Sequence, residues 1–345
     1  MNISIMIPTK NRPNFILRLL EYYSKSEFKG YILIGDASDK HLFIETKNNI
    51  LKYKNRLKIQ HFYEPDLLTD ETNSFLSKHV KTDFCAYVAD DDIILVSSLI
   101  DCINFLIQNP EYSAVHGLAF LMSMEDRAMV SIRDYKMVTS VKDNSLDRVE
   151  DFFIEMSQLN MSVIRTNINI DAFDVVNKLS KYYANYIFCE LVHGAVVLAR
   201  GKIGKINKAY LIRQGHNEQS FKTLDISEWQ SHEGFASAYQ TLKSTIGSEI
   251  ISKGDCDEND VSTRTSNILS KWFNNLQSEN NKKKVSTKKD LSFKLSGFIK
   301  KSALISSIYK KIKFNIELSK AVSKQDILSK NDIRLFIDLV EKNNC

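Results

Sequence analysis

Three consecutive carboxylates, Asp90, Asp91 and Asp92, are the residues of this chain best suited to chemistry. They directly follow residues 84–88, an apolar, aromatic and β-branched run that predicts a buried strand. Adjacent carboxylates repel one another and raise one another's pKa, so a divalent metal, a basic partner or water must offset the repulsion. Alternatively, Asp92 caps a helix that begins with the apolar residues 93–96. The triplet by itself leaves both readings open.

Polar side chains also follow the other strands predicted in the first part of the chain. Strands are expected at residues 3–7, 31–34, 57–63 and 84–88, and helices at residues 15–24, 41–53, 70–79 and 97–107. Besides the acid triplet, the polar residues just past these strands are Thr9, Lys10, Asn11, Arg12, Asp36 and Glu64. Repeated strand-helix units predict a mostly parallel sheet, in which ligands bind at the carboxyl ends of the strands. Each residue alone could be a turn residue or a cap, but their recurrence favours a binding site.

Two further polar positions stand out later in the chain. Glu190 and His193 interrupt an almost wholly apolar segment at residues 186–198. Because an unpaired buried carboxylate costs several kcal/mol, Glu190 lies either at a functional site or in a structural ion pair. His216 follows a later predicted strand, close to Arg213, and a lone loop histidine is more often a surface residue than a ligand.

The composition is that of a soluble globular protein, with 43% hydrophobic and 26% charged residues in 345. The net charge of +5 is unevenly distributed, because residues 282–313 contain eleven lysines and one acid, which leaves residues 1–281 acidic. The acidic body argues against nucleic acid as a partner, whereas the basic tail is suited to an anionic surface.

The cellular location is expected to be the cytoplasm. The five cysteines show no paired or zinc-type spacing, which is typical of reduced thiols. The first cations follow the N-terminal apolar run, unlike those of a signal peptide. No run approaches the roughly twenty apolar residues of a membrane-spanning helix.

The rest of the chain changes from mixed to helical patterns and predicts three parts. Strands are expected at residues 113–121 and 205–212, a hairpin up to residue 140, and helices at residues 146–157, 171–183, 227–245, 259–276, 291–314 and 326–342. The predicted parts are an α/β domain at residues 1–225, a helical extension at residues 226–281 and a basic amphipathic helical tail at residues 282–345.

The tail begins with a lysine-rich stretch, residues 282–289, that is typical of a solvated linker. Apolar residues then fall on one helical face, surrounded by lysines: Leu291, Leu295, Phe298, Ile305, Ile308 and Ile312. This face could lie on an anionic membrane surface or dock on the body of the protein.

Three segments resemble the ordered signatures of a known family. Ile-Met-Ile-Pro-Thr-Lys-Asn-Arg-Pro at residues 5–13, Ile-Gly-Asp-Ala-Ser at residues 34–38 and Ala-Asp-Asp-Asp at residues 89–92 are similar to motifs of GT-A fold, family 2-type glycosyltransferases. The likeness is strongest to the small bacterial branch that builds cell-surface polysaccharides, and it covers residues 1 to about 225. It implies an α/β GT-A fold with a mostly parallel central sheet flanked by helices, here followed by a helical C-terminal extension.

The resemblance also implies roles for single residues. The donor nucleotide would contact Pro8, Thr9, Asn11, Arg12, Asp36, Asp90 and Asp91. Asp92, in the position of a DXD-type motif, and His216 would bind Mn²⁺ or Mg²⁺, with Arg213 at the diphosphate. Glu190 is similar to the acidic residue that serves as catalytic base.

The chain departs from the family pattern at several points. Ala89 stands where many relatives have an acid, and Leu191 stands where an aspartate usually follows the catalytic acid. Thr72 and Phe75 replace the arginine and glycine that flank the asparagine corresponding to Asn73. The Gln-x-x-Arg-Trp pattern of processive synthases is absent, which favours transfer of a single sugar.

The function that these residues favour is inverting, metal-dependent transfer of a sugar from a nucleotide-diphosphate donor, expected to be a UDP-sugar. The acceptor would be a hydroxyl of a glycan or lipid-linked saccharide, at the inner face of the plasma membrane. A metal would stabilise the leaving diphosphate, and a carboxylate would take the acceptor proton. The alternatives are a catalytically inactive nucleotide-sugar-binding protein of the same fold and a sugar-phosphate nucleotidylyltransferase. The latter needs a glycine-rich loop where this chain has Pro-Thr-Lys-Asn-Arg.

Overall fold

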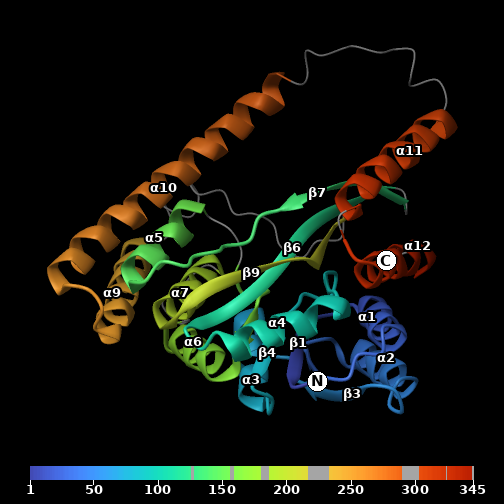
Figure 1. Ribbon diagram of the computed structural model, residues 1–345, viewed down its shortest axis with the longest axis horizontal. Coiled ribbons are helices and arrows are strands. Elements are labelled where there is room, and N and C mark those ends of the chain that lie inside the picture. Colours follow the sequence, from blue (N-terminus) through green and yellow to red (C-terminus); the bar gives the residue numbers. More distant parts are fainter. Residues whose placement is uncertain are drawn as a thin grey trace.

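The computed structural model describes residues 1–125, 128–155, 159–179, 186–216, 233–289, 303–323 and 325–343. Its strands form one nine-stranded sheet in the order β3-β2-β1-β4-β8-β6-β9-β5, with β7 paired to β6 (Figure 1). Helices flank the sheet, and further helices form the C-terminal part. The predicted α/β fold class is confirmed.

The first half of the sheet is parallel, as predicted. Its strands are β1 (Ile3–Thr9), β2 (Tyr31–Asp36), β3 (Lys58–Tyr63) and β4 (Phe84–Tyr87), and the helices that follow them are α1 (Pro13–Lys25), α2 (Lys40–Leu51), α3 (Thr69–His79) and α4 (Val96–Gln108). Every residue of β1 is buried, which explains its continuous apolar run. The register sets Thr9 beside Asp36 and Asp36 beside Tyr63, so the polar strand ends lie at one edge.

The second half of the sheet mixes both directions. It contains β5 (Ile93–Ile94), β6 (Tyr112–Glu125), β7 (Ala128–Tyr135), β8 (Val163–Arg165) and β9 (Lys202–Gly215), with helices α5 (Ser145–Glu155), α6 (Thr166–Leu179) and α7 (Tyr186–Arg200). The predicted hairpin is the antiparallel pair β6–β7, whereas β6 and β9 run parallel. The short strand β8 joins the halves by pairing antiparallel to both β4 and β6.

The reading of Asp92 as a helix cap is wrong. The apolar residues after it form β5, which pairs antiparallel with β9 through Ile93–Ile212 and Ile94–Leu211. Helix α4 begins only at Val96, with Leu95 as its N-cap residue. The acid triplet therefore lies between two strands of the sheet.

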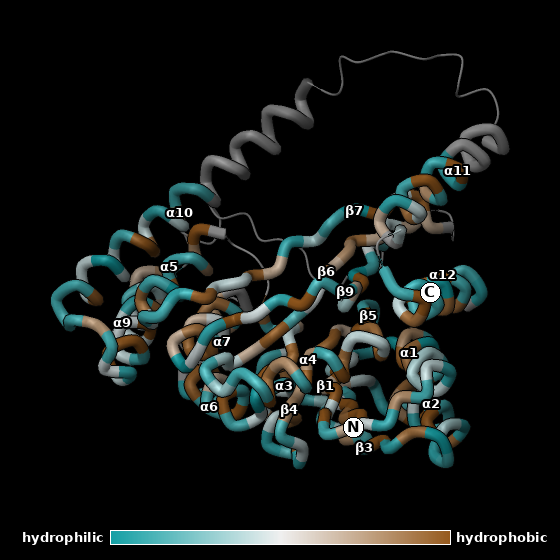
Figure 2. Tube along the Cα trace, viewed as in Figure 1, coloured by the Kyte–Doolittle hydropathy of each residue, from teal (hydrophilic) through white to brown (hydrophobic). Residues whose placement is uncertain are grey.

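The C-terminal part consists of α9 (Phe235–Lys253), α10 (Glu258–Lys289), α11 (Ala303–Val322) and α12 (Ile327–Asn343). The prediction of a linker at residues 282–289 is wrong, because α10 continues through them. Figure 1 shows α10 and α11 reaching away from the sheet, while α12 returns to pack on α1 and α4. In Figure 2 hydrophilic positions prevail in the coloured part of α10, whereas the strands around β1 are mostly hydrophobic. The predicted boundary at residue 225 lies outside the described residues, and the three-part division stays a prediction.

Among the described residues, no helix combines the length and the apolar character that crossing a membrane requires.

Candidate active site

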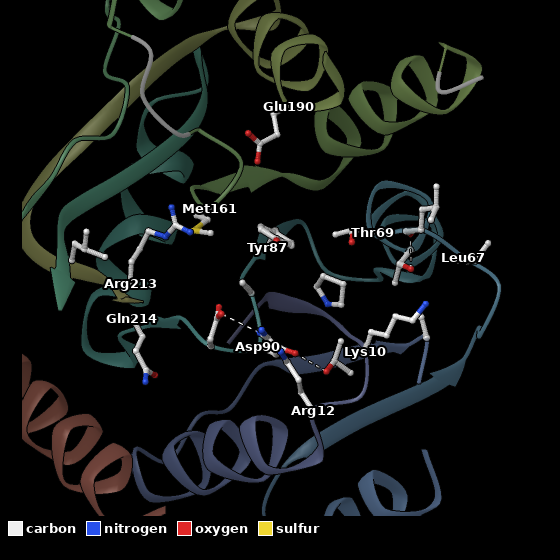
Figure 3. Close-up of a pocket in the computed structure, with 18 of the residues that line it drawn as sticks. Lys10, Arg12, Leu67, Thr69, Tyr87, Asp90, Met161, Glu190, Arg213 and Gln214 are labelled. Carbon is white, nitrogen blue, oxygen red and sulfur yellow. Dashed lines mark hydrogen bonds and ion pairs between the residues drawn. The ribbon is translucent and has the colours of Figure 1, made fainter. Parts of the chain in front are cut away.

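A pocket of about 500 Å³ lies at the carboxyl ends of β1, β2 and β4, on the edge where polar residues were predicted to meet. This volume is within the usual range for small-molecule sites. The pocket is lined by Pro8, Thr9, Lys10, Arg12, Ala37, Leu67, Leu68, Thr69, Thr72, Tyr87, Ala89, Asp90, Asp91, Leu121, Tyr135, Met161, Glu190, Arg213 and Gln214. Figure 3 shows that these side chains come from both halves of the sheet and from α3 and α7.

Asp90 is held by residues that follow β1. Its carboxylate accepts hydrogen bonds from Thr9 Oγ1 at 2.7 Å and from Arg12 Nη1 at 2.9 Å. Burial and the charge of Asp91 raise the pKa of Asp90 to about 6, although Arg12 and Thr9 act in the opposite direction. The first and fourth strands thus bring an arginine and a carboxylate together at the floor of the pocket.

Asp91 links the pocket to His216. Its Oδ2 lies 3.1 Å from Arg12 Nη1 and 3.0 Å from His216 Nε2. Burial alone would raise the pKa of Asp91, but the hydrogen bonds and positive charges of His216 and Arg12 lower it. Asp91 is therefore an ionised carboxylate at the pocket wall with an imidazole beside it.

Asp92 is not among the lining residues, and it holds the neighbouring strand β9. It is 1% exposed, and it accepts hydrogen bonds from Arg213 Nε at 2.9 Å and from the Gln214 backbone N–H at 3.0 Å. Burial raises its pKa to about 6, against the opposing effect of Arg213. Arg213 also donates to the Tyr135 hydroxyl at 2.7 Å and lies over that ring. This chain of contacts joins β5, β9 and β7.

The loops after β1 and β2 are joined by a second set of contacts. Asp36 is fully buried, and its carboxylate accepts hydrogen bonds from the Ser38 backbone N–H at 3.0 Å and meets His61 Nε2 at 2.9 Å. Asn11, with a φ of 57°, donates its backbone N–H to Ser38 Oγ and accepts from the Asp39 backbone N–H. These bonds give the pocket edge beside Ala37 a fixed shape.

Glu190 projects from α7 toward the space above Tyr87 and Met161 (Figure 3). The residues that follow it on α7, such as Val192 and Val196, are buried against the core. Glu190 is partly exposed and lines the pocket, unlike the residues after it. Burial, followed by the charge of Glu190, raises the pKa of Tyr87.

The predicted site residues divide into two groups. Those that line the pocket are Pro8, Thr9, Arg12, Asp90, Asp91, Glu190 and Arg213. Those that stand behind the pocket wall, in contact with lining residues or their loops, are Asn11, Asp36, Asp92 and His216. Their roles toward a ligand stay predictions.

Several lining residues were not among the predicted site residues. Lys10 was recognisable, because it stands between Thr9 and Arg12 in the sequence. Tyr135 lies on β7 and Met161 follows α5, and neither carried a local signal, because only the sheet pairing brings them to the pocket.

A metal would have few protein ligands here. Among the described residues, no group of three or more His, Cys, Asp and Glu side chains is arranged to hold a metal ion. Asp91 and His216, whose side chains lie 3.0 Å apart, could supply one or two ligands, because Mg²⁺ is usually bound through one or two carboxylates and completes its shell with water and substrate phosphates. Asp92 fits less well, since both of its oxygens already accept hydrogen bonds.

Solved structures with the same fold show low sequence identity to this chain. Residues 1–349 of S. aureus TarS in complex with UDP-GlcNAc match with a TM-score of 0.54 and 16% identity, over 99% of this chain and 90% of that one. The same fragment without ligand matches with a TM-score of 0.51 and 15% identity, and its complex with UDP matches with a TM-score of 0.50 and 16% identity. A longer TarS chain matches with a TM-score of 0.48, and the present chain spans 43% of its length. No protein-family model and no curated protein matches. The chain therefore shares the fold of TarS residues 1–349.

Proposed function

We propose that this protein is a glycosyltransferase of the GT-A type that transfers a sugar from a UDP-sugar to a hydroxyl of a glycan or lipid-linked saccharide. The observation that carries the proposal is the meeting, in one pocket, of Arg12, Asp90 and Asp91 on one side and Glu190 on the other. A fold shared with a UDP-GlcNAc complex of TarS supports the choice of UDP as the nucleotide.

The donor would lie along the carboxyl ends of β1, β2 and β4. Lys10 and Arg12 offer positive charge to the phosphates, and Ala37 with Leu67 and Leu68 offers apolar surface to the base. We assign Mn²⁺ or Mg²⁺ to Asp91 and His216 in place of Asp92, because the Asp92 carboxylate is taken up by Arg213 and Gln214. When bound, the ion would neutralise charge on the diphosphate as it leaves.

Glu190 is the residue that we assign as catalytic base. It faces the pocket from the side opposite Arg12, and Tyr87 and Met161 surround it with partly apolar surface (Figure 3). A carboxylate placed there could take the acceptor proton while the leaving diphosphate departs on the other side. Attack from the Glu190 side would invert the anomeric centre.

Calorimetry followed by an activity assay tests this proposal. We expect UDP to bind with higher affinity in the presence of Mn²⁺, and the protein to hydrolyse or transfer sugar from at least one UDP-sugar. Glu190→Gln should retain UDP binding and lose turnover by 10²-fold or more, on the order of what a general base contributes. The matched control is Glu111→Gln, an exposed glutamate outside the pocket, which should behave as wild type.

Binding without turnover would instead favour the non-catalytic alternative, in which the fold retains the nucleotide site alone. Ala89 in the pocket wall and Leu191 after Glu190 are the features that support it. Absence of UDP binding would contradict both. The nucleotidylyltransferase alternative is weakened because β1 leads into Lys10, Asn11 and Arg12 without a glycine.

For the basic tail we propose contact with an anionic membrane surface. Of the predicted apolar face, Ile312 is 55% exposed, and nearby Ile316 is 52% exposed. Phe314, on the same helix α11, is 2% exposed, and α11 packs on β7. Leu291, Leu295 and Phe298 lie outside the described residues, and the side chains of Ile305 and Ile308 are likewise outside the description. The exposed isoleucines and the lysines around them fit a membrane interface better than a second docking contact.

A further inference from the structure

The C-terminal helix α12 packs on α1 and α4, close to the segment that follows the acid triplet, although more than two hundred residues separate them in sequence. Ile333, Phe336, Leu339 and Val340 are buried on the side of α12 that meets the body. Figure 1 shows α12 beside α1, and contacts with α4 complete the arrangement. The helix thus touches α1, which contacts Asp91, and α4, which begins four residues after Asp92.

The segment from Asp91 to Ser97 is held from behind by α1 and α12. Arg18 of α1 donates from Nη2 to the Asp91 carbonyl oxygen at 3.1 Å. The Val96 backbone N–H donates to the Tyr22 hydroxyl at 3.2 Å, and the Ser97 backbone N–H donates to Asp332 Oδ2 of α12 at 2.8 Å. Asp332 therefore satisfies a free backbone N–H in the first turn of α4, where a negative charge is also favourable.

A second connection runs through aromatic rings to the side chain of Asp91. Arg18 is fully buried, and its guanidinium lies 4.8 Å from the ring centre of Phe15 and 5.6 Å from that of Phe336. Phe15 in turn packs against the His216 ring, with centroids 5.3 Å apart, and His216 contacts the Asp91 carboxylate. Phe336 of α12 thus forms one wall of the space that fixes Arg18.

Two separate contacts therefore join α12 to the segment from Asp91 to Ser97. One reaches its backbone through Phe336 and Arg18, and the other reaches the start of α4 through Asp332. Asp332 also accepts a hydrogen bond from Ser26 Oγ at 3.1 Å, which fixes α12 to the end of α1. Asp332 contacts the segment from Asp91 to Ser97 directly, and Phe336, on the same helix, contacts it through Arg18.

We propose that α12 is a positioning element for the diphosphate end of the donor site, with Asp332 and Phe336 as its positioning residues. Loss of their contacts lets the Asp91 segment shift, and because Asp91 faces the diphosphate in the proposed function, affinity for the diphosphate falls. This inference rests on that proposed function. The nucleoside end of the pocket, formed after β1 and β2, should keep its affinity.

The inference is tested by measuring the affinity of full-length variants for UDP and for uridine, which lacks the diphosphate. Asp332→Ala removes the bond to Ser97, and Phe336→Leu removes the ring beside Arg18 while keeping apolar bulk. Each should weaken UDP binding about tenfold, which corresponds to about 1.4 kcal/mol, and leave uridine binding unchanged. Asp332→Asn keeps an acceptor oxygen and should lie between Asp332→Ala and wild type.

The control is Asp338→Ala, an exposed aspartate on the same helix, which should bind both ligands as wild type does. Affinities are measured well below the lowest melting temperature of the set, so that every variant is folded. Lower melting temperatures with unchanged UDP affinity would overturn the inference, since α12 would then contribute stability alone. Equal loss for UDP and uridine would overturn it as well. If wild type binds no UDP, the proposed function fails and this inference fails with it.

Discussion

At the scale of single residues, the acid triplet is balanced by cations that come from distant parts of the chain. Asp90 and Asp91 share Arg12, Asp91 also meets His216, and Asp92 is paired with Arg213. The three carboxylates thus have different partners and positions, although they are adjacent in the sequence. Asp90 and Asp91 face the pocket, and Asp92 joins strands behind it.

The pairing of Asp92 with Arg213 predicts a specific pattern of stability. Arg213→Met should lower the free energy of unfolding by about 3 kcal/mol, because it leaves a buried carboxylate without its cation. The double variant Arg213→Met with Asp92→Asn should recover most of that loss, since no buried charge remains. Urea unfolding of the two single variants, the double variant and wild type measures the coupling. A double variant no more stable than Arg213→Met would contradict a buried ion pair.

The buried His193 predicts a pH dependence. Burial lowers its pKa to about 4, from about 6.5 in an unfolded chain. Above pH 6.5 the imidazole is neutral in both the folded and the unfolded chain. Between pH 6.5 and pH 4 the unfolded chain binds a proton that the folded chain does not, so the free energy of unfolding falls as the pH falls through this range. The loss should approach about 3 kcal/mol near pH 4.

His193→Gln, which does not titrate, isolates this effect. The comparison is the change in unfolding free energy between pH 7.5 and pH 5 for wild type and for the variant, because a constant packing cost cancels in that difference. Wild type should lose more stability on acidification. Equal losses would mean that His193 is not the titrating group.

At the scale of elements, local patterns predicted most of the first half of the fold. The continuous apolar run of β1 and the helical spacing of apolar residues in α1 can be seen in the residues of each element alone. Strand β5 has only Ile93 and Ile94, and it exists because β9, far along the chain, pairs with it. The same long-range pairing brings Arg213 to Asp92, so neither the strand nor the ion pair could be predicted from neighbouring residues.

The close packing of α3 on β2 gives a prediction about the shape of the pocket. A Cβ added at Gly35 would collide with Thr72 and press on Leu76 of α3. Gly35→Ala should therefore cost about 1–3 kcal/mol of stability and, by moving Thr72 at the pocket edge, weaken UDP binding.

Gly247→Ala is the matched control in a helix. A Cβ there meets nothing closer than 4.0 Å, and alanine should stabilise α9 by up to about 1 kcal/mol. Thermal unfolding and UDP calorimetry of both variants check the pair. Wild-type UDP affinity in Gly35→Ala would show that α3 does not set the pocket shape.

At the scale of the whole molecule, the basic charge is carried by helices that reach away from the sheet. The C-terminal end of α10 carries Lys282, Lys283, Lys284, Lys288 and Lys289 (Figure 1). Because α12 is docked on the body, truncating the tail would expose buried surface, and a change in membrane binding could not be assigned to the lysines. Substitution within the full chain avoids this.

Replacing those five lysines by glutamine should weaken binding to vesicles with anionic lipid by at least tenfold at low salt, because each lysine near such a surface contributes on the order of 1 kcal/mol. The difference should shrink at high salt. The control replaces five exposed lysines of the α/β body: Lys29, Lys47, Lys52, Lys54 and Lys81. Equal weakening by both sets would point to net charge alone, and no weakening by the α10 set would contradict the proposed membrane contact.

A structure of the full-length protein with a UDP-sugar and Mn²⁺ tests the central claim most directly. The proposed function predicts the nucleotide over the ends of β1 and β2, the diphosphate and metal beside Asp91 and His216, and the sugar facing Glu190 across the pocket. A UDP-sugar bound outside this pocket, or bound inside it with the sugar directed away from Glu190, would contradict it.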